Sequence, residues 1–379
     1  MTSLPRNDGP TGQLGGAPSR RARVAELLQR ERLDCIAAVG QRYATWLTGY
    51  HRYFGGLSAS LVCPDGSVTL VVSPDEVPLA EAASSAQRVT AFGAAGFGLQ
   101  LDPTSRLVEA IRQAAEVRAA SRIGVAGVEL SVLDWADGPE RQVVDADLDR
   151  LSRVKDRDEV DKVCHAYELC WRAQAAVSEA AEAGASEIEM FTAAHGTAQL
   201  GHRSPVDFVA DLLVGERTAY VCCPVAVAGE RCPGPTDWVV ADVAIGADGY
   251  GGDTCRTYVR PSTPQHVIEA IGKLETIRGD MADQLRPGAV GAELHNELRE
   301  RLMHAFPGGT FPHHAGHGVG LTGFEYPHLI PGDQSIVERG TIIALEPGIY
   351  FPGHWGARVE QLFLVTDRGG VELATAVGA

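Results

Sequence analysis

Four carboxylates interrupt apolar segments in the second half of the chain, and this pattern constrains the fold more than any other feature. In the segment WVVADVAIGADGYGGDTCRTYV, Asp242 stands within an apolar run and Asp253 follows eleven residues later, after a glycine-rich stretch. An unpaired carboxylate inside a core is costly, so these residues need a partner. A hairpin with its turn in the glycine-rich stretch would bring the two carboxylates across from one another. On the alternative interpretation, Asp242 ends a strand and Asp253 lies in a turn.

The segment TIIALEPGIYFPGHWGARVEQLFLVT repeats this arrangement. Glu346 ends an apolar strand, Pro347 and Gly348 interrupt it, and Glu360 lies inside the next strand. Between the two segments lies the histidine-rich stretch HHAGHGVGLTGFEYP, residues 313–327. Two such hairpins with histidines between them favour a shared site over unrelated turns.

Four carboxylates gathered in a core would repel one another, and their pKa values would rise unless cations neutralised them. Two divalent metal ions meet this need, with bridging carboxylates and a histidine completing the coordination. A donor set that is rich in oxygen and contains one imidazole suits Mn(II), Fe(II), Co(II) or Zn(II) better than a thiolate-type zinc site does. Two ions roughly 3.5 Å apart hold a bridging hydroxide as nucleophile and polarise a carbonyl. The predicted chemistry is therefore hydrolysis of a C–N bond.

The acidic composition excludes some function classes. The 379 residues carry a formal net charge of −16, which argues against nucleic acid or an anionic membrane as the main partner. The chain has neither the roughly 18 consecutive apolar residues of a membrane span nor a signal-peptide pattern. We therefore predict a cytoplasmic protein, whose eight cysteines are thiols.

The pattern along the chain predicts two domains after a tail. Residues 1–20 are rich in glycine and proline and are expected to be disordered. Residues 21–147 alternate helix and strand, which indicates an α/β domain. Residues 148–379 combine long helices with strand-rich stretches, which indicates an α+β domain.

Local signals place several elements within these domains. In the first domain we expect a helix over 20–33, a strand over 34–40 and a hairpin over 58–74. The second should open with one long amphipathic helix over 151–184, closed by Gly184. Ser186 with Glu189 forms a capping-box pattern that begins the next helix. Two further helices are expected near residues 264–285 and 286–306.

The ordered motifs resemble those of the pita-bread metallohydrolases, a superfamily that includes prolidase, aminopeptidase P, methionine aminopeptidase and creatinase. The motifs are the Asp-x10-Asp segment, HxxxHGVGL, RPGAVGAELH, EPGIY and GARVE. The stretch RLDCIAAVGQRYATWLTGY is also similar to the N-terminal domain of creatinase and prolidase. The resemblance implies a creatinase/prolidase-type α/β N-terminal domain followed by a pita-bread catalytic domain.

Carried over by position, the resemblance also implies a set of site residues. The metal ligands would be Asp242, Asp253, His317, Glu346 and Glu360, which would hold two divalent ions, with Mn(II) expected first and Co, Fe or Zn as alternatives. Three residues would have catalytic roles. His313 would bind substrate and stabilise the developing oxyanion, Glu346 would also handle the proton of the attacking water, and Arg358 would orient the last glutamate. His314 has no role in the family pattern, and a homodimer is expected.

The sequence departs from the prolyl-specific members of the superfamily at two positions. Phe324 replaces a histidine seven residues after the ligand histidine, and the stretch VGERTAYVCCPVAVAGERCPGP lacks a histidine found upstream of the first aspartate. The expected function is a hydrolase of the Xaa-Pro aminopeptidase or dipeptidase type with an atypical pocket for a small peptide. The alternatives are a hydrolase or lyase acting on a C–N bond of a non-peptide small molecule, and a non-catalytic binding module.

Overall fold

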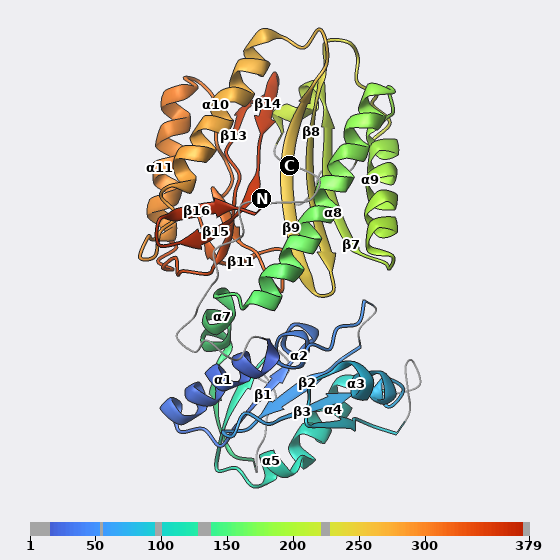
Figure 1. The fold of residues 1–379 in the computed structure, drawn as a ribbon, viewed down its shortest axis with the longest axis vertical. Coiled ribbons are helices and arrows are strands. Elements are labelled where there is room, and N and C mark those ends of the chain that lie inside the picture. The colour runs from blue at the N-terminus through green and yellow to red at the C-terminus, as the bar shows by residue number, and fades with distance from the viewer. Residues whose placement is uncertain (1–15, 54–55, 95–100, 128–137, 221–227, 374–379) are drawn as a thin grey trace. The chain divides into compact units, whose positions relative to one another are not determined.

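The computed structural model describes residues 16–53, 56–94, 101–127, 138–220 and 228–373. The chain forms two compact units, one comprising Met1–Ser152 with Asp156–Asp158 and the other Arg153–Lys155 with Glu159–Ala379 (Figure 1). The predicted boundary at residues 147/148 lies several residues upstream of this division, inside helix α7 (Asp145–Arg153).

The first unit is built on a six-stranded mixed sheet of order β4-β3-β2-β1-β5-β6. Its strands are β1 (Cys35–Val39), β2 (Ala59–Val62), β3 (Val68–Val72), β4 (Arg88–Ala91), β5 (Arg122–Ala126) and β6 (Glu140–Val143). Successive side chains of a strand point to opposite faces. Accordingly Val71 joins one apolar cluster, while Leu70 and Val72 join another. Both faces of the sheet are therefore covered, as the α/β pattern predicts.

Five helices accompany this sheet in the described part of the first unit before α7. They are α1 (Ala17–Glu31), α2 (Gln41–Thr48), α3 (Val77–Ala83), α4 (Pro103–Gln113) and α5 (Ala115–Arg118). Helix α1 begins at Ala17, so residues 17–20 are helical and not part of a disordered tail. The buried side chain of Arg20 explains this, because its Nε donates to the carbonyl oxygen of Trp46 over 2.6 Å. Residues 1–15 of the predicted tail lie outside the described residues.

The long helix predicted over 151–184 is in fact two helices. Helix α7 ends at Arg153 and α8 (Arg157–Glu182) begins four residues later. Between them the amide of Lys155 donates to the carbonyl oxygen of Gly340 over 3.0 Å, and the Lys155 side chain is buried. The apolar periodicity runs through this break, so the sequence pattern alone does not reveal it.

A three-stranded antiparallel sheet forms one half of the second unit. Its order is β7 (Asp207–Val214), β8 (Trp238–Ala247) and β9 (Tyr250–Val259). Helices α8 and α9 (Glu187–His202) lie along this sheet (Figure 1). Alternate β8 residues, Val239 to Ile245, pack with these helices in one core cluster. Asp242 has the opposite parity, so it points to the face away from α8 and α9.

The other half of the second unit contains a five-stranded sheet of order β11-β10-β12-β15-β16 and a two-stranded ribbon, β13–β14. The strands are β10 (Gly316–Gly318), β11 (Glu325–His328), β12 (Ile342–Leu345), β13 (Gly348–Phe351), β14 (Trp355–Arg358), β15 (Gln361–Thr366) and β16 (Gly369–Glu372). Helices α10 (Gln265–Ala282) and α11 (Gly291–Ala305) pack against it in a second core cluster. Among the residues that the structure describes, no helix is long and apolar enough to span a membrane.

Candidate metal centre

The hairpin β8–β9 places Asp242 and Asp253 on one face. Asp242 pairs with Cys255, and Asp253 pairs with Ala244. Since cross-strand partners share a face, the two aspartates are diagonal neighbours, two residues out of direct register. The predicted hairpin is therefore present, but the carboxylates do not stand directly opposite each other.

Glu360, in the second carboxylate-bearing segment, is placed next to the two aspartates by hydrogen bonds of its main chain to β9. It lies between β14 and β15 and not within a longer strand. Its amide donates to the carbonyl oxygen of Cys255 over 2.9 Å, and the Thr254 hydroxyl donates to the Glu360 carbonyl oxygen over 3.1 Å. These bonds fix Glu360 beside Asp253 on β9.

His317 and Glu346 are brought in by the strand pair β10–β12. His317 pairs with Ala344, and Glu346 directly follows the last residue of β12. The amide of Glu346 donates to the carbonyl oxygen of Ala315 over 3.1 Å, which holds the start of EPGIY next to the histidine stretch. Both side chains are buried.

The His317 imidazole is the point where these elements meet. Its Nε2 lies 3.7 Å from Oδ2 of Asp253, 3.6 Å from Oε1 of Glu346 and 3.9 Å from Oε1 of Glu360. Its Nδ1 is 3.1 Å from the carbonyl oxygen of Gly318, which favours the tautomer with the proton on Nδ1. Nε2 is then the atom with a lone pair directed at the carboxylates.

The electrostatics of this cluster indicate that a cation is needed. Burial, together with repulsion from neighbouring carboxylates, raises the pKa of Asp253 and of Glu360 well above the ordinary value. Burial lowers the pKa of His317 to about 3, so its imidazole is neutral. Oε1 of Glu360 is buried and has no hydrogen-bond partner among the described residues.

These residues fit a divalent metal ion. Asp253, His317 and Glu360 offer ligand atoms that all lie within 4.8 Å of one another, and all three residues are buried. A neutral imidazole and carboxylates are the donors that such ions take. A bound cation would neutralise the repelling charges and engage the unpartnered oxygen of Glu360.

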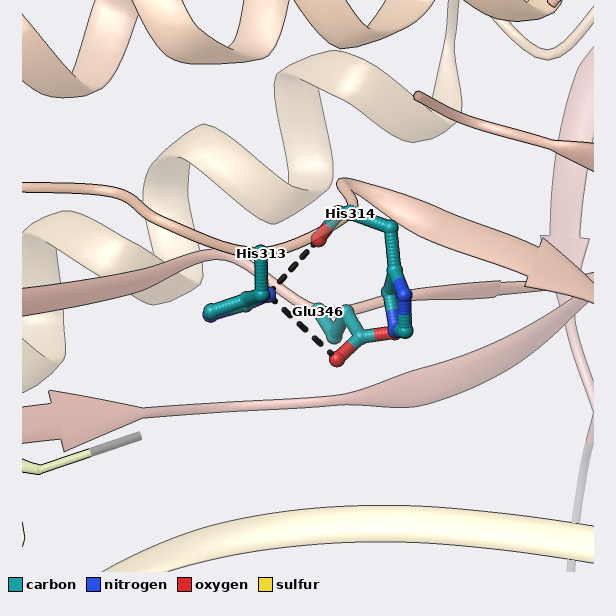
Figure 2. A group of neighbouring side chains, drawn as sticks. All are labelled: His313, His314 and Glu346. Atoms are coloured by element: carbon teal, nitrogen blue, oxygen red, sulfur yellow. Dashed lines mark hydrogen bonds and ion pairs between the residues drawn. The ribbon is translucent and has the colours of Figure 1, made fainter. Parts of the chain in front are cut away.

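A second group of candidate ligands lies next to the first and shares Glu346. His313, His314 and Glu346 also offer ligand atoms within 4.8 Å of one another. Figure 2 shows the two imidazoles on either side of the Glu346 carboxylate. Nε2 of His314 is 2.6 Å from Oε1 of Glu346, and Nδ1 of His313 is 3.7 Å from Oε2. His314, which the family pattern left without a role, thus contacts a predicted ligand directly.

Asp242 differs from the other four predicted ligands because it is paired with a cation of the protein. Its Oδ2 lies 2.5 Å from Nη2 of Arg358, and its side chain is 20% exposed. The same Nη2 is 3.3 Å from Oδ2 of Asp211, which pairs with Asp242 across β7 and β8. Arg358 therefore contacts the first aspartate and not Glu360, the residue that it was expected to orient.

Sequence reasoning missed two residues of this network, Asp211 and Tyr350. The Tyr350 hydroxyl is 3.2 Å from Nη1 of Arg358 and 3.0 Å from Nε2 of His313, so it links the two predicted catalytic residues. Asp211 interrupts the apolar strand DFVADLLV as Asp242 interrupts its own strand, and this signal was available. Tyr350 carries no comparable signal, because a tyrosine in an apolar strand is ordinary.

Phe324 stands at the position where prolyl-specific enzymes carry a histidine, and it faces the site. Its ring centroid is 4.1 Å from that of His317 and 5.6 Å from that of His314, although the side chain is 55% exposed. His328 lies in β11 and pairs with His317 of β10. Of the stretch in which the second histidine is missing, residues 221–227 lie outside the described residues.

The fold and this cluster of buried carboxylates and imidazoles define a two-domain metallohydrolase. Residues 161–367, more than half of the chain, match the model of metallopeptidase family M24. The chain belongs to this family, whose members use divalent metal ions, and it is a metal-dependent peptidase of that type. All five predicted metal ligands fall within the matched range.

Related proteins agree with this assignment. The chain is 29% identical over 368 residues to the probable dipeptidase PepE of Mycobacterium tuberculosis, covering 95% of this chain and 92% of that protein. It is 27% identical over 234 residues to the Xaa-Pro dipeptidase of Pyrococcus furiosus, covering 62% of this chain and 66% of that protein.

Solved structures confirm the predicted fold class. The prolidase from Pyrococcus horikoshii OT3 superimposes with a TM-score of 0.78 at 22% identity, covering 95% of this chain and 99% of that one. The dipeptidase PepE from Mycobacterium ulcerans gives a TM-score of 0.74 at 25% identity, covering 95% of each chain.

Proposed function

We propose that this protein is a dinuclear-metal dipeptidase that hydrolyses the C–N bond of a small peptide, with a pocket unlike that of an ordinary prolyl peptidase. The proposal rests on one buried cluster, formed by Asp253, His317, Glu346 and Glu360. Its carboxylates repel one another and need a cation to neutralise them. The relatives named dipeptidase and Xaa-Pro dipeptidase support a peptide as substrate.

The two ions would be held by Asp242, Asp253, His317, Glu346 and Glu360. Asp242 joins the set if its carboxylate shares its negative charge between Arg358 and an ion, which its second oxygen allows. We propose Mn(II) as the native metal, with Co, Fe or Zn as alternatives, because the donors are mostly carboxylates. When bound, the ions supply the charge that polarises the scissile carbonyl and lowers the pKa of the attacking water.

Glu346 is suited to moving the proton. Burial raises its pKa, although His314 and Arg358 act in the opposite direction. Placed beside the ions, the Glu346 carboxylate would accept a proton from the attacking water and then donate it to the leaving amine. Because burial lowers the pKa of His313, this neighbouring imidazole stays neutral and does not repel an incoming proton.

His313 and Arg358 act through a fixed hydrogen-bond chain. The guanidinium of Arg358 donates to the Tyr350 oxygen, and the Tyr350 hydroxyl can then donate to Nε2 of His313. Nδ1 of His313 lies 2.7 Å from the carbonyl oxygen of His314 and carries the proton in this arrangement. The chain orients the His313 ring beside Glu346. To bind the substrate carbonyl, Nδ1–H would exchange its bond to the His314 carbonyl oxygen for one to the substrate.

Phe324 makes a non-peptide amide the second candidate substrate. Its ring faces His317 where a hydrogen-bond donor to a peptide carboxylate or carbonyl would stand in prolyl-specific enzymes. A substrate with an apolar group at that point avoids leaving a polar group unpaired.

The retained carboxylates and histidines argue against a non-catalytic binding module. That the protein forms a homodimer is still a prediction, based on the resemblance. Its cytoplasmic location is also still a prediction, based on the sequence.

The test is hydrolysis by metal-loaded enzyme of a panel that contains dipeptides, Xaa-Pro-Yaa tripeptides and N-acyl or guanidino compounds. We expect dipeptides with apolar side chains to be cleaved fastest, and activity to disappear with Glu346→Gln. Cleavage of only the N-acyl or guanidino compounds would replace the dipeptidase with the second candidate.

A further inference from the structure

A buried lysine, Lys155, contacts the loop of residues 320–325, which contains Phe324. Lys155, in the break between α7 and α8, is only 1% exposed. Its Nζ lies 2.5 Å from Oε2 of Glu325, a residue 170 positions away in the chain, and 3.2 Å from the carbonyl oxygen of Arg153. A lysine is almost never fully buried unless its charge is paired, and Glu325 provides that pairing.

The partner carboxylate also fixes the loop that contains it. Oε1 of Glu325 accepts a hydrogen bond from the Thr322 amide over 3.3 Å. The ion pair lies tightly against Gly320, where a Cβ atom would collide with both the Lys155 side chain and the Glu325 carboxylate. The carbonyl oxygen of Gly320 accepts from the Gly251 amide over 2.7 Å, which joins the loop to β9. Residues 320–325 are thus held at one end by the bond to β9 and at the other by the Glu325 carboxylate.

Phe324 lies between these anchors. The Thr322 hydroxyl donates to the Phe324 carbonyl oxygen over 2.7 Å, and the next residue is Glu325 itself. The Phe324 side chain is more than half exposed and makes ring contacts only with histidines of the site among the ring pairs of the described residues. Its position against His317 therefore depends on the backbone that Glu325 and Lys155 hold.

We propose that Lys155 is a positioning residue for substrate specificity, acting through Glu325 to hold Phe324 against His317 as the apolar wall of the substrate pocket. This inference rests on the proposed function and deepens it, because it names the group that sets the preference for an apolar substrate. Removing the lysine leaves a mostly buried carboxylate without its counter-charge, so the loop must rearrange to hydrate it. The ring then loses its fixed place.

The first test measures the loop itself by hydrogen–deuterium exchange of the metal-loaded full chain. We expect Lys155→Met and Glu325→Gln each to raise exchange in peptides that cover residues 318–328, while peptides from α11 stay unchanged. The matched control is Arg301→Met, which removes ion pairs with Glu297 on α11 and Asp280 on α10, away from the loop. Unchanged exchange of residues 318–328 in both loop variants would show that the ion pair of Lys155 with Glu325 does not hold the loop. This result does not depend on any substrate being cleaved.

The second test is a kinetic cycle on dipeptides that carry leucine or serine at either position. The measured quantity is the ratio of kcat/KM for the leucine substrate to kcat/KM for the serine substrate. Lys155→Met should lower this ratio by about ten- to a hundredfold, the effect of small misplacements in a site. The metal content should stay at the wild-type value, and Arg301→Met should leave the ratio unchanged. If Lys155→Met does not fold, Glu325→Gln must show the same loss.

The cycle is completed in a Phe324→Ala background. If Lys155 acts through Phe324, Lys155→Met has no further effect on the ratio once the ring is gone. A full additional loss in that background, or loss of metal in Lys155→Met, would overturn the proposal. A wild type that cleaves none of the dipeptides would refute the proposed function instead, and the exchange experiment would still decide whether Lys155 holds the loop.

Discussion

His313 and His317 are four residues apart, but their ring nitrogens contact different groups. Nε2 of His317 faces three carboxylates, whereas Nε2 of His313 contacts the hydroxyl of Tyr350. The first arrangement suits a metal ligand. The second suits a group that is oriented by its neighbours and acts on substrate.

We therefore expect the two alanine variants to separate metal binding from turnover. His317→Ala should lose metal occupancy, because it removes the neutral imidazole from the buried cluster. His313→Ala should keep its metal and lose about 100-fold or more in kcat, the usual effect of removing one group that stabilises developing charge. Elemental analysis and steady-state kinetics measure both. Equal metal loss in the two variants would show that their roles are wrongly assigned.

Phe324 leads to a prediction about substrate choice. A peptide carboxylate or carbonyl facing this ring is left without a hydrogen bond, which costs about 1–3 kcal/mol. Phe324→His should therefore improve kcat/KM for Xaa-Pro dipeptides by about ten- to a hundredfold. The measurement compares both enzymes on Xaa-Pro dipeptides and on dipeptides with apolar side chains. Efficient Xaa-Pro cleavage by the wild type, with no gain from the histidine, would contradict this account of the pocket.

At the level of single elements, local patterns in the sequence predict much of the structure. The capping box of α9 is present, with Oε2 of Glu189 accepting from the Ser186 amide over 2.8 Å. The hairpin β2–β3 turns at Gly66, whose φ of 77° is one that glycine adopts without strain. These features are predictable because residues a few positions apart determine them.

The break between α7 and α8 is not predictable in this way. Apolar spacing continues through residues 151–163, and at the break Lys155 contacts Gly340 and Glu325, which are far along the chain. Likewise, Asp211 joins the site only because β7 pairs with β8, and Tyr350 only because its ribbon returns beside His313. The five predicted ligands could be named from the family pattern, but the pairing of Asp242 with Arg358 could not.

The α9 cap gives a stability prediction. Ser186→Ala removes the N-cap hydroxyl and should lower the free energy of unfolding by about 1 kcal/mol. Urea unfolding followed by circular dichroism measures this change. Thr192→Ala, at an exposed position in the same helix, is the control and should change the free energy by less than about 0.5 kcal/mol. A Ser186→Ala variant as stable as this control would show that the cap contributes nothing.

For the whole molecule, the second unit is organised so that separate sheets deliver their polar residues to one place. The hairpin β8–β9, the strand pair β10–β12 and the segment before β15 each contribute, and each is fixed by main-chain hydrogen bonds. Because burial and mutual repulsion raise the pKa values of Asp253 and Glu360, the cluster destabilises the metal-free fold. Metal binding and stability should therefore be linked.

The most direct test of the account is the metal content of the reconstituted protein, measured together with its thermal stability. After loading with Mn(II) or Co(II), elemental analysis should give about two ions per chain. A chelator should lower Tm, since an ion at 100 times its dissociation constant stabilises the fold by about 2.7 kcal/mol. Glu360→Gln should lower both the metal content and the effect of the chelator. A wild-type protein that binds no ions, with a Tm that the chelator leaves unchanged, would contradict the central claim.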